Sequence, residues 1–532
     1  MTNNEFDYIV IGAGAAGCTL AREIMARDMG SVLLVESGEE PRSRLLRVPS
    51  QYLHSFGSRW DWSYETRPQT QLANRSIRLP AGHTLGGSTA INAMIWIEPK
   101  PKDFDAWEQR GGPSWSSDSV GCMFVEARSR MTQIAQCWSD DCRLPSLPPL
   151  HPNMQRLLDQ AVEQGWTASS YPQGLNQPCS PGIDAYQRMQ HRGRRVSQWD
   201  LLKKEFERSP SAIRDRLTVM SNTHAHRLQF RGQRAVGVQC RSHVGEASTF
   251  TAARGVLLCA GAIETPRLLM ASGIGPKDRL EWAGIECRED LPELGSHLQD
   301  HLVFPVVMRL DSARTESDSN RRSRLERLQY VRYRTGALSS NLAELGGFFE
   351  EPDMFQWHIT PTHYLEPLPF RDPAEHVSFG VTSFGRSPGG LVLPAVCRGA
   401  WDQVERMPLR IDPTYLSLEE DQTRFLDAIE TTRHRIQSSP WQSWLGREVF
   451  PRCSDRDRLL SYLRRFAGTI YHYAGSCALG ESKSSCLTPS LEVRGVENLW
   501  VCDASAMPRL VHCNPQATVV MMAMHWLAHQ AR

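Results

Sequence analysis

A glycine-rich turn separates an apolar strand pattern from a helical pattern at the start of the chain. Residues Asp7 to Ile11 form a short, mostly apolar run, and Gly12 to Gly17 read Gly-Ala-Gly-Ala-Ala-Gly. Cys18 to Arg27 then carry apolar residues at helical spacing, and a second apolar run, Ser31 to Val35, follows. A strand, a helix and a second strand within about 30 residues form a βαβ unit, whose strands pair in parallel. The chain is therefore predicted to contain a parallel sheet with a phosphate-binding turn at its edge.

The three glycines of this turn, Gly12, Gly14 and Gly17, meet different requirements. The first allows a tight turn, the second lets the main chain approach a pyrophosphate, and the third lets the helix pack on the strand. Glu36 stands 19 residues after Gly17, at the end of the second strand. A carboxylate there accepts hydrogen bonds from both ribose hydroxyls of an adenosine and repels a 2′-phosphate. The pattern predicts dinucleotide binding and leaves NAD and FAD both open.

Two more short apolar runs, Gly255 to Ala260 and Leu499 to Cys502, are typical of strands buried on both faces, and we expect them to join the same sheet. Because long segments of other character separate these runs, the nucleotide domain is predicted to be discontinuous. Residues 301–487 contain strand-like pieces such as Val377 to Val381 and a helical pattern from Leu418 to Ile436. The expected division is residues 1–135, 215–300 and 488–532 for the nucleotide domain, and residues 136–214 and 301–487 for a substrate domain.

The composition argues against several classes of function. The 532 residues carry 60 Lys and Arg against 59 Asp and Glu, a formal charge of +1, so no overall field favours nucleic acid or an anionic membrane. The 14 cysteines include no CxxC pair, so we expect reduced thiols and no metal site. Ala517 to Leu527 is shorter than the ~20 residues of a membrane-spanning helix and predicts a core helix instead. The polar N-terminus lacks the layout of a secretory signal, which favours a cytoplasmic protein; the oligomeric state is left open.

Four further segments resemble the signature motifs of the glucose-methanol-choline (GMC) family of FAD-dependent oxidoreductases, in the family's order. They are Leu79 to Met94, Gly261 to Pro276, Tyr471 to Gly480 and Val501 to Pro515, and Leu298 to His301 also resemble the family. The match spans nearly the whole chain. It implies an α/β fold, with a Rossmann-like FAD-binding domain on a mostly parallel sheet and an α+β substrate domain on an antiparallel sheet.

The resemblance also implies which residues hold FAD. By position in the motifs, Ala15 and Ala16 would contact the pyrophosphate, Glu36 would contact the ribose, and main chain near Ala225 would contact the adenine. Asp503 and Ala504 would lie at the phosphate and the ribityl chain. Gly87, Asn92 and Ala93 would lie at the flavin end, and Pro515 and Gln516 would lie at the pyrimidine edge of the flavin. In several family members a histidine of the first motif is covalently bonded to the flavin. The matching residue here is Ile91, so non-covalent FAD is expected.

Oxidation of an alcohol to a carbonyl removes the hydroxyl proton and a hydride, which requires a base beside the hydride acceptor. His472 matches the family's base, and Asn514 matches the residue that holds the substrate oxygen. The resemblance therefore implies a small-molecule alcohol substrate, with reduced flavin returned by dioxygen or another acceptor. His512, two residues before Asn514, is an alternative for the second position.

The chain departs from the family pattern near the site. Ala81 and His83 stand where the family often has Arg and Lys, and Cys513 stands where Gly usually precedes the partner residue. Tyr471 and Tyr473 replace the commoner Trp and Pro on either side of the base. These changes weaken any inference about the substrate, which the sequence does not identify.

Three other functions remain open at this point. The family includes hydroxynitrile lyases that keep FAD without redox turnover and use the same histidine region as acid and base. A light-driven decarboxylase of this fold and a non-catalytic FAD-binding protein are further alternatives, although neither needs a base such as His472.

Two groups of side chains are of interest outside the motifs. Residues 320–334 include an arginine cluster that is either a solvated face or a patch at the mouth of the cavity that attracts anions: Arg321, Arg322, Arg324, Arg327, Arg332 and Arg334. Several aromatic residues either line a pocket or belong to the ordinary core: Trp60, Trp62, Tyr64, Trp357, Phe384 and Trp441.

Overall fold

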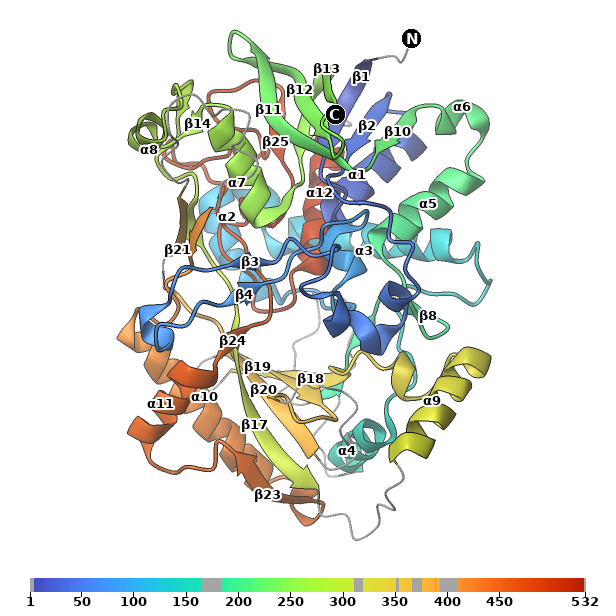
Figure 1. Ribbon diagram of the computed structural model, residues 1–532, viewed down its shortest axis with the longest axis vertical. Helices are drawn as coiled ribbons and strands as arrows, with labels where there is room; N and C mark the ends of the chain where they lie inside the picture. Colours follow the sequence, from blue (N-terminus) through green and yellow to red (C-terminus); the bar gives the residue numbers. More distant parts are fainter. Residues whose placement is uncertain are drawn as a thin grey trace.

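The computed structural model describes residues 4–163, 183–310, 319–350, 354–365, 376–387, 389–392 and 409–530. Two large β-sheets lie one above the other in Figure 1. Helix α12 (Gln516–Gln530) runs from the level between the sheets up alongside the upper one. The upper sheet contains strands from residues 5–35, 217–258 and 499–501, and the lower sheet contains strands from residues 184–185, 302–383 and 445–469.

The upper sheet has seven strands and contains the predicted βαβ unit. In spatial order they are β10 (Leu217–Met220), β2 (Val32–Val35), β1 (Glu5–Ile11), β13 (Ala247–Leu258), β12 (Arg234–Ser242) and β11 (Thr223–Arg231), with β25 (Leu499–Val501) beside β13. β10, β2, β1, β13 and β25 pair in parallel, and β11 and β12 continue the sheet in antiparallel fashion. The strands Val32–Val35 and Leu499–Val501 are buried throughout, as expected of strands covered on both faces.

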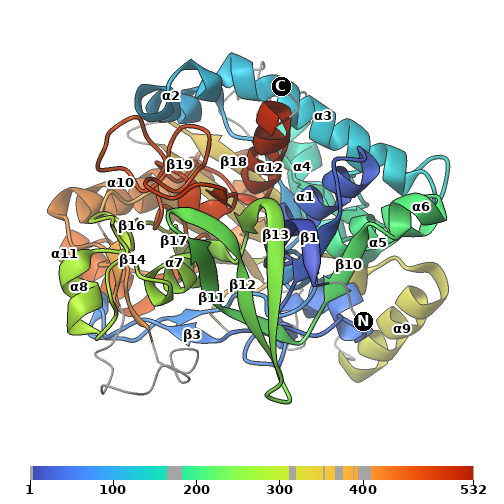
Figure 2. The same cartoon turned by 90° about the horizontal axis from the view of Figure 1, so that it is seen from above.

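Helices cover one face of this sheet in two layers, which Figure 2 shows from above. α1 (Ala15–Ala26) packs against α12 (Gln516–Gln530) and α5 (Gln198–Arg208), and α3 (Ser117–Ala135) packs behind α12 and α5. α12 is buried from Gln516 to Leu527, which confirms the predicted core helix. α7 (Gly261–Ala271) follows β13 and packs on β11.

The lower sheet is antiparallel throughout. Its strands in spatial order are β23 (Leu445–Phe450), β17 (Leu302–Leu310), β20 (His376–Ser383), β19 (Phe355–Thr360), β18 (Leu345–Phe349) and β6 (Asp184–Ala185), with β24 (Gly468–Thr469) beside β17. α10 (Glu419–Gln437) lies on β17 and β20, and α11 (Arg456–Phe466) packs on α10. Smaller elements are α2 (Asp105–Gly111), α4 (Pro152–Glu163), α6 (Ser211–Arg214), α8 (Lys277–Trp282), and a sheet of β16 (Ser296–Leu298), β21 (Gly389–Val392) and β22 (Arg410–Asp412).

The predicted fold class is confirmed, and one strand is longer than predicted. The run expected at Gly255 to Ala260 is the end of a 12-residue strand, β13, whose first half pairs with β12 and whose second half pairs with β1 and β25. The strand is longer because residues before Gly255 alternate between the two faces of the antiparallel part, a pattern weaker than a continuous apolar run. α5 lies against α1 and α3, whereas the sequence-based division placed it in the substrate domain. We therefore propose that residues 198–208 be grouped with the nucleotide domain.

The arginine-rich segment forms α9 (Ser319–Tyr333), which stands apart on the lower right of Figure 1. Arg327 and Arg332 are exposed, and Arg334 lies over the Tyr330 ring at 5.1 Å. The side chains of Arg321, Arg322 and Arg324 lie outside the described residues. No arginine of α9 is among the described residues that line the cavity presented below, which favours the solvated face over the anion-attracting patch.

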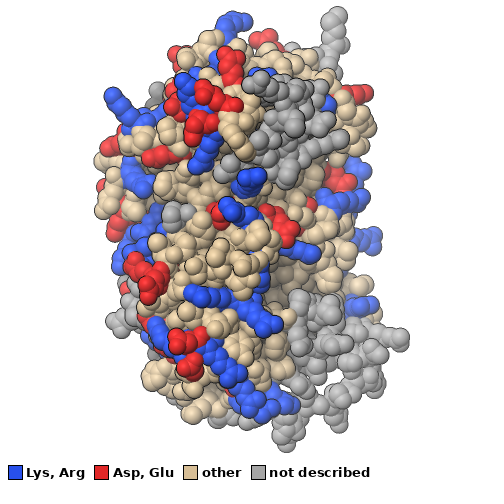
Figure 3. Space-filling model, turned by 60° about the vertical axis from the view of Figure 1, so that its left-hand side comes forward, with Lys and Arg blue, Asp and Glu red and all other residues tan. Residues whose placement is uncertain are grey.

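Basic and acidic side chains are intermixed on the face shown in Figure 3, in line with the near-zero net charge. Within the described part of the chain, no helix combines the length and apolar character needed to cross a bilayer.

Candidate active site

One large cavity, of about 490 Å³, extends from the edge of the upper sheet to the lower sheet. Residues of the glycine-rich turn line one end, and residues of β19 and of the loop after β24 line the other. The cavity therefore lies where strands of the parallel sheet end, the position at which α/β folds bind their ligands. The predicted residues among its lining are Gly12, Gly14, Ala15, Ala16, Glu36, Gly87, Asn92, Ala93, Ala225, His472, Asp503, Ala504, Asn514, Pro515 and Gln516.

The glycine-rich turn packs against the main chain directly after β13, the strand that lies beside β1 in the sheet. Gly12 has φ +96°, and a Cβ there would lie 2.5 Å from the Cys259 carbonyl oxygen. A Cβ on Gly17 would lie 1.9 Å from the Gly12 carbonyl oxygen, so no side chain fits there. At Gly14 the nearest protein atom to a Cβ would be 3.9 Å away, which leaves that side of the turn open to the cavity. Gly12 and Gly17 are thus required by contacts within the protein, whereas Gly14 leaves room at the wall of the cavity.

Glu36 closes the same end of the cavity at the end of β2. Its Oε2 accepts a hydrogen bond of 2.9 Å from the Ala13 backbone N–H, and its Oε1 accepts one of 2.9 Å from the Gly38 N–H. Burial raises the pKa of the Glu36 carboxyl, and these hydrogen bonds oppose that rise. Oε1 also accepts from the Ser37 hydroxyl at 3.3 Å, whereas Oε2 keeps a second lone pair, so the fixed carboxylate can accept from a ribose hydroxyl as well.

Asp503 follows β25 and anchors the turn between β13 and α7. Its Oδ2 accepts from the Gly261 N–H at 2.8 Å and from the Thr265 hydroxyl at 2.6 Å, and its Oδ1 accepts from the Ser505 N–H at 2.8 Å. Burial raises the pKa of Asp503, opposed by these bonds. The carboxylate is fully engaged by protein donors, so it shapes this wall of the cavity as a structural anchor.

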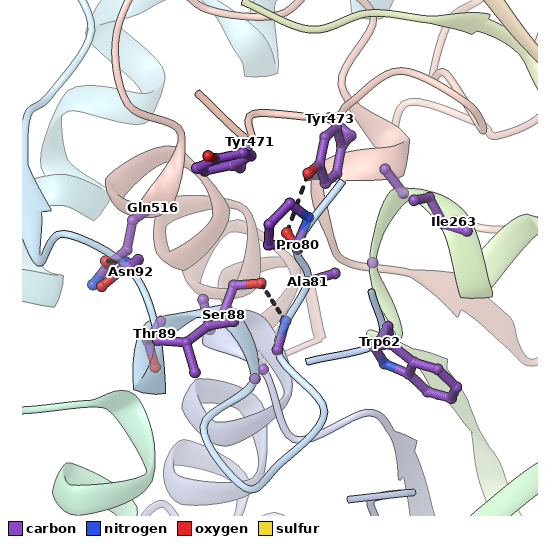
Figure 4. Close-up of a pocket in the computed structure, with 18 of the residues that line it drawn as sticks. Trp62, Pro80, Ala81, Ser88, Thr89, Asn92, Ile263, Tyr471, Tyr473 and Gln516 are labelled. Carbon is purple, nitrogen blue, oxygen red and sulfur yellow. Dashed lines mark hydrogen bonds between the residues drawn. The ribbon is translucent and has the colours of Figure 1, made fainter. Parts of the chain in front are cut away.

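The loop of the first motif lies directly on the glycine-rich turn. Gly87 has φ +51°, and a Cβ there would lie 2.7 Å from the Gly14 Cα. Figure 4 shows the following residues, Ser88, Thr89 and Asn92, around one side of the cavity, with the Ser88 hydroxyl accepting from the Gly82 N–H at 3.1 Å. Ile91 is buried and lines the cavity, where the family's covalent histidine would stand.

Gln516, the first residue of α12, provides an independent test of whether a cofactor fits. Its Oε1 accepts from the Asn92 amide at 2.7 Å, whereas its Nε2, buried at the cavity wall, has no hydrogen-bond partner in the described structure. A buried N–H without a partner is costly, so a ligand acceptor is expected there. The positive end of α12 faces the same point, which adds a preference for an electron-rich edge. The open turn at Gly14 and this orphaned donor both fit a dinucleotide that carries an electron-rich ring at its other end.

His472 lies at the far end of the cavity, in the loop after β24, and is only 9% exposed. Its Nε2 is 3.2 Å from the Asn514 amide nitrogen, and its Nδ1 is 2.9 Å from Nδ1 of His301. Burial, followed by the nearby His358, lowers the pKa of His472 to about 3. The ring is therefore neutral at neutral pH and able to accept a proton.

A consistent set of tautomers links these groups. If the Asn514 N–H donates to Nε2 of His472, then Nδ1 of His472 carries the proton and donates to His301. His301 then carries its own proton on Nε2, and its ring also has a hydrogen bond with the Val511 backbone. Burial lowers the pKa of His301 well below its usual value, so both rings are neutral.

Asp300 positions both histidines through their backbones. Its Oδ1 accepts from the N–H groups of His301 and His472, each at 2.8 Å. Its Oδ2 accepts from the Tyr415 hydroxyl at 2.5 Å and from the Thr469 hydroxyl. Burial raises the pKa of Asp300 to about 6. This single carboxyl ties the start of β17 to the loop that carries His472.

Asn514 is oriented from its other side by β19. Its Oδ1 lies 3.4 Å from Nε2 of His358 and 3.5 Å from the Gln356 amide nitrogen. Strand alternation places Gln356, His358 and Thr360 on the side of the cavity, whereas Trp357 points to α10 and donates to Thr432 at 2.8 Å. The Asn514 N–H groups are therefore directed to His472.

His512 lies outside the cavity lining. Its backbone N–H donates to Asp103 at 2.9 Å, and its Nδ1 also contacts the same carboxylate oxygen. Its ring packs edge-on against Phe384 at 4.7 Å. This geometry favours Asn514 over His512 as the second residue of the site.

The sequence reasoning gave no role to His301, Asp300, His358 or Arg195. His301 and Asp300 stand in a segment that resembles the family, so a signal was available and went unused. His358 gave none, because one histidine in a strand pattern is more often a packed side chain. Arg195 likewise gave no signal, because it lies outside every motif recognised in the sequence.

Some of the residues that depart from the family pattern, and some of the aromatic candidates, line the cavity, whereas others do not. Trp62 and Tyr64 line the cavity, and His83 packs on the Trp62 ring at 4.2 Å. Tyr473 donates to the Pro80 carbonyl at 3.1 Å, as Figure 4 shows, and Tyr471 and Ala81 also line the cavity. Trp60, Trp357, Phe384 and Trp441 are not among the described lining residues, and Trp357 and Trp441 are fully buried in the core.

Comparison with known proteins gives a consistent picture. The model of the N-terminal part of "GMC oxidoreductase" matches residues 6–303, and that of the C-terminal part matches residues 402–523. The chain is 31% identical to "Alcohol dehydrogenase [acceptor]" of Pseudomonas putida, over 97% of this chain and 94% of the relative. It is also 31% identical to "Oxygen-dependent choline dehydrogenase" of Xanthomonas axonopodis pv. citri, over 98% and 94% of the two chains. The solved structure of pyridoxine 4-oxidase from Mesorbium loti superposes with a TM-score of 0.79, at 24% identity over 99% of each chain.

Proposed function

This chain belongs to the GMC oxidoreductase family, and from that premise we propose that it oxidises an alcohol to a carbonyl with His472 as the general base. As a member of that family it is a flavoprotein oxidoreductase that uses FAD and acts on alcohol-type donors. The observation that carries the finer proposal is the pairing of a buried, neutral His472 with the Asn514 amide at 3.2 Å, in the same cavity as the dinucleotide end.

The residues of the chain divide the work of the reaction. Bound FAD supplies the hydride acceptor. A substrate hydroxyl that enters between His472 and Asn514 would replace their mutual contact, accept from the Asn514 N–H and donate its proton to Nε2 of His472. The hydroxyl proton thus goes to the imidazole, the electron pair of the O–H bond becomes the second bond of the carbonyl, and the C–H bond of the same carbon breaks to release a hydride to the acceptor that bound FAD would supply.

His301 offsets part of the cost of the charge that develops on His472, which burial and His358 oppose. Protonation at Nε2 leaves its Nδ1–H donating to His301, which is neutral and accepts through Nδ1. A hydrogen bond from a charged donor is stronger than one from a neutral donor. His301 therefore favours the protonated product of the step over the starting imidazole.

The substrate end of the cavity suits a neutral, largely apolar alcohol. The charged side chains among the described lining residues, Glu36, Glu264, Arg267 and Asp503, all follow strands of the upper sheet. Around His472 the lining residues are instead aromatic, aliphatic or uncharged polar: Tyr52, Leu53, Phe56, Thr360, Tyr364, Ile470, Tyr471 and Tyr473. A cationic or anionic substrate would lose hydration there without a countercharge, so we propose aryl or aliphatic primary alcohols.

An anaerobic panel of alcohols tests this assignment. We expect benzyl-type and medium-chain primary alcohols to bleach the flavin absorbance, whereas choline and hydroxy acids of similar size act at least about tenfold more slowly. Readmission of oxygen then separates an oxidase, which forms peroxide, from a dehydrogenase that needs another acceptor. Cleavage of a cyanohydrin while the flavin stays oxidised, with no alcohol bleaching it, would contradict the oxidation and support a lyase.

The FAD is expected to be non-covalent. Ile91 has no nucleophilic atom, and it is the residue that faces the cavity at the family's covalent position. Acid precipitation should therefore leave a colourless pellet and all the flavin in the supernatant. Yellow colour that stays with the precipitated protein would show a covalent bond to another side chain.

The rate of flavin reduction is expected to be independent of pH on the acid side. Because burial lowers the pKa of His472 to about 3, its neutral form, the form that accepts the proton, predominates at every pH well above that value. Asp300, which holds the His472 backbone, has its pKa raised by burial to about 6, so the profile is recorded in Asp300→Asn as well as in the wild type. In Asp300→Asn the rate should stay level from about pH 8 to about pH 5, whereas an unshifted histidine would lose activity below about pH 6.5. An acid limb with an apparent pKa between about 5 and about 6.5 that persists in Asp300→Asn would contradict a neutral, buried base.

A further inference from the structure

Arg195, on the segment β9 (Arg194–Arg195) before α5, is a buried cation behind the first-motif loop, 6% exposed. Its guanidinium donates to the Leu46 carbonyl at 2.8 Å, the Thr89 carbonyl at 3.1 Å, and the Asn92 carbonyl at 2.6 Å. It also donates to the Asn92 side-chain oxygen at 2.8 Å. In the described part of the chain no carboxylate pairs with it, and the nearby Asp200 instead caps α5 through Ser197.

Arg195 and the Met94 N–H together fix which atom of the Asn92 amide faces Gln516. A guanidinium only donates, and so does the Met94 N–H, which reaches the same Asn92 Oδ1 at 2.9 Å. Asn92 must therefore turn its oxygen to Arg195 and its Nδ2 to Gln516. Because that Nδ2 donates, Gln516 must present its own oxygen to Asn92, which leaves its Nε2 as the end that faces the cavity.

We propose that Arg195 is a positioning residue for the flavin: through Asn92 and Gln516 it presents a polarised N–H donor to the pyrimidine edge of FAD and makes the bound flavin easier to reduce. The inference rests on the proposed function, because it requires FAD in this cavity. Reduction adds negative charge to the pyrimidine edge, and a donor fixed there stabilises the reduced form more than the oxidised form.

The charge of Arg195 persists: the nearby Asp200 attracts it electrostatically, but no carboxylate of the described residues is hydrogen-bonded to it. Burial lowers the pKa of Arg195 to about 9, so the group is cationic at neutral pH. Its four hydrogen bonds go to carbonyl and amide oxygens, which satisfy donors but supply no full negative charge. A buried cation in this position is costly unless it serves an electron-rich neighbour, and the flavin edge at the end of the relay is such a neighbour.

The test uses purified FAD-loaded protein and two probes that need no alcohol. Sulfite adds reversibly to oxidised flavin and places negative charge on the same ring, so its dissociation constant reports stabilisation of that charge; equilibration with a redox dye reports the reduction potential. In Arg195→Gln we expect the sulfite constant to rise at least about tenfold, the effect of one hydrogen bond to a charged group, and the potential to become more negative. Arg195→Lys, which keeps the charge, should retain most of the wild-type sulfite affinity.

A second variant keeps the test decisive if Arg195→Gln does not fold. Gln516→Glu keeps the shape of the side chain and replaces the donor at the cavity with an acceptor, so the same two shifts are expected. FAD-loaded Arg195→Gln or Gln516→Glu with wild-type sulfite affinity and potential would overturn the relay. A wild-type protein that does not take up FAD would instead overturn the proposed function, so the two failures are distinguishable.

Discussion

Replacement of His472 by alanine is expected to leave a yellow, FAD-bound protein whose flavin is reduced by alcohol about 10²- to 10⁴-fold more slowly than in the wild type, the usual contribution of a general base. Among the described neighbours of His472, His301 does not line the cavity and Asn514 has no basic atom. His358 lines the cavity, but its Nε2 contacts the Asn514 oxygen at 3.4 Å and its Nδ1 the Thr382 hydroxyl at 3.2 Å, so both ring nitrogens are already engaged. The measurement is anaerobic stopped-flow reduction with an alcohol from the panel. FAD content should not change, since the His472 ring contacts His301 and Asn514 and not the dinucleotide end.

His512→Ala is the matched control for this experiment. His512 stands two residues from Asn514 but bonds to Asp103, and it does not line the cavity. We expect its rate to stay within about threefold of the wild type, in keeping with a side chain that touches no reacting atom. Unimpaired reduction in His472→Ala, or a loss in His512→Ala as large as the loss in His472→Ala, would remove His472 from the proposed role.

The parts of the fold that the sequence predicted are those with a local physical cause. Gly17 is required by a main-chain contact within the β1–α1 turn, and Gly12 by its positive φ in that turn as well as by the Cys259 main chain, so both leave a strong local pattern. The core helix α12 was also predicted from a local pattern, because an apolar run that is too short to span a membrane is typical of a helix buried in the core. β13 was only half predicted, because its first half depends on pairing with β12, which a period-2 pattern specifies weakly.

The residues that were missed owe their place to pairings between distant segments. His301 meets His472 because β24 pairs with the start of β17, whose paired residues stand about 165 positions earlier in the chain. His358 reaches Asn514 because β19 is a central strand of the lower sheet and its alternation points that side chain to the cavity. Neither contact has a spacing that could be read along the chain, whereas His472 and Asn514 were recognisable from the segments around them.

The same argument applies to Arg195. Its partners, Leu46, Thr89 and Asn92, are more than a hundred residues away in sequence, and four hydrogen bonds to carbonyl and amide oxygens leave no acidic partner to search for. A buried arginine without a carboxylate is visible only once the loops are assembled. The electrostatics of the flavin end could therefore be derived from the structure but not from the motif that contains Asn92.

Gly14→Val is expected to yield a folded apoprotein that binds FAD on the order of 10²-fold more weakly, whereas Gly12→Ala should fail to fold or melt far below the wild type. A Cβ at Gly14 has no protein atom closer than 3.9 Å, so a side chain there projects into the open cavity and displaces only the ligand. A Cβ at Gly12 meets the Cys259 carbonyl oxygen at 2.5 Å in a backbone with φ +96°, so it strains the sheet itself. Circular dichroism and thermal melts of the apoproteins, followed by FAD titration by flavin fluorescence, separate the two effects. Wild-type FAD affinity in Gly14→Val would mean that the pyrophosphate does not approach this turn, and the assignment of the cavity's dinucleotide end would then be wrong.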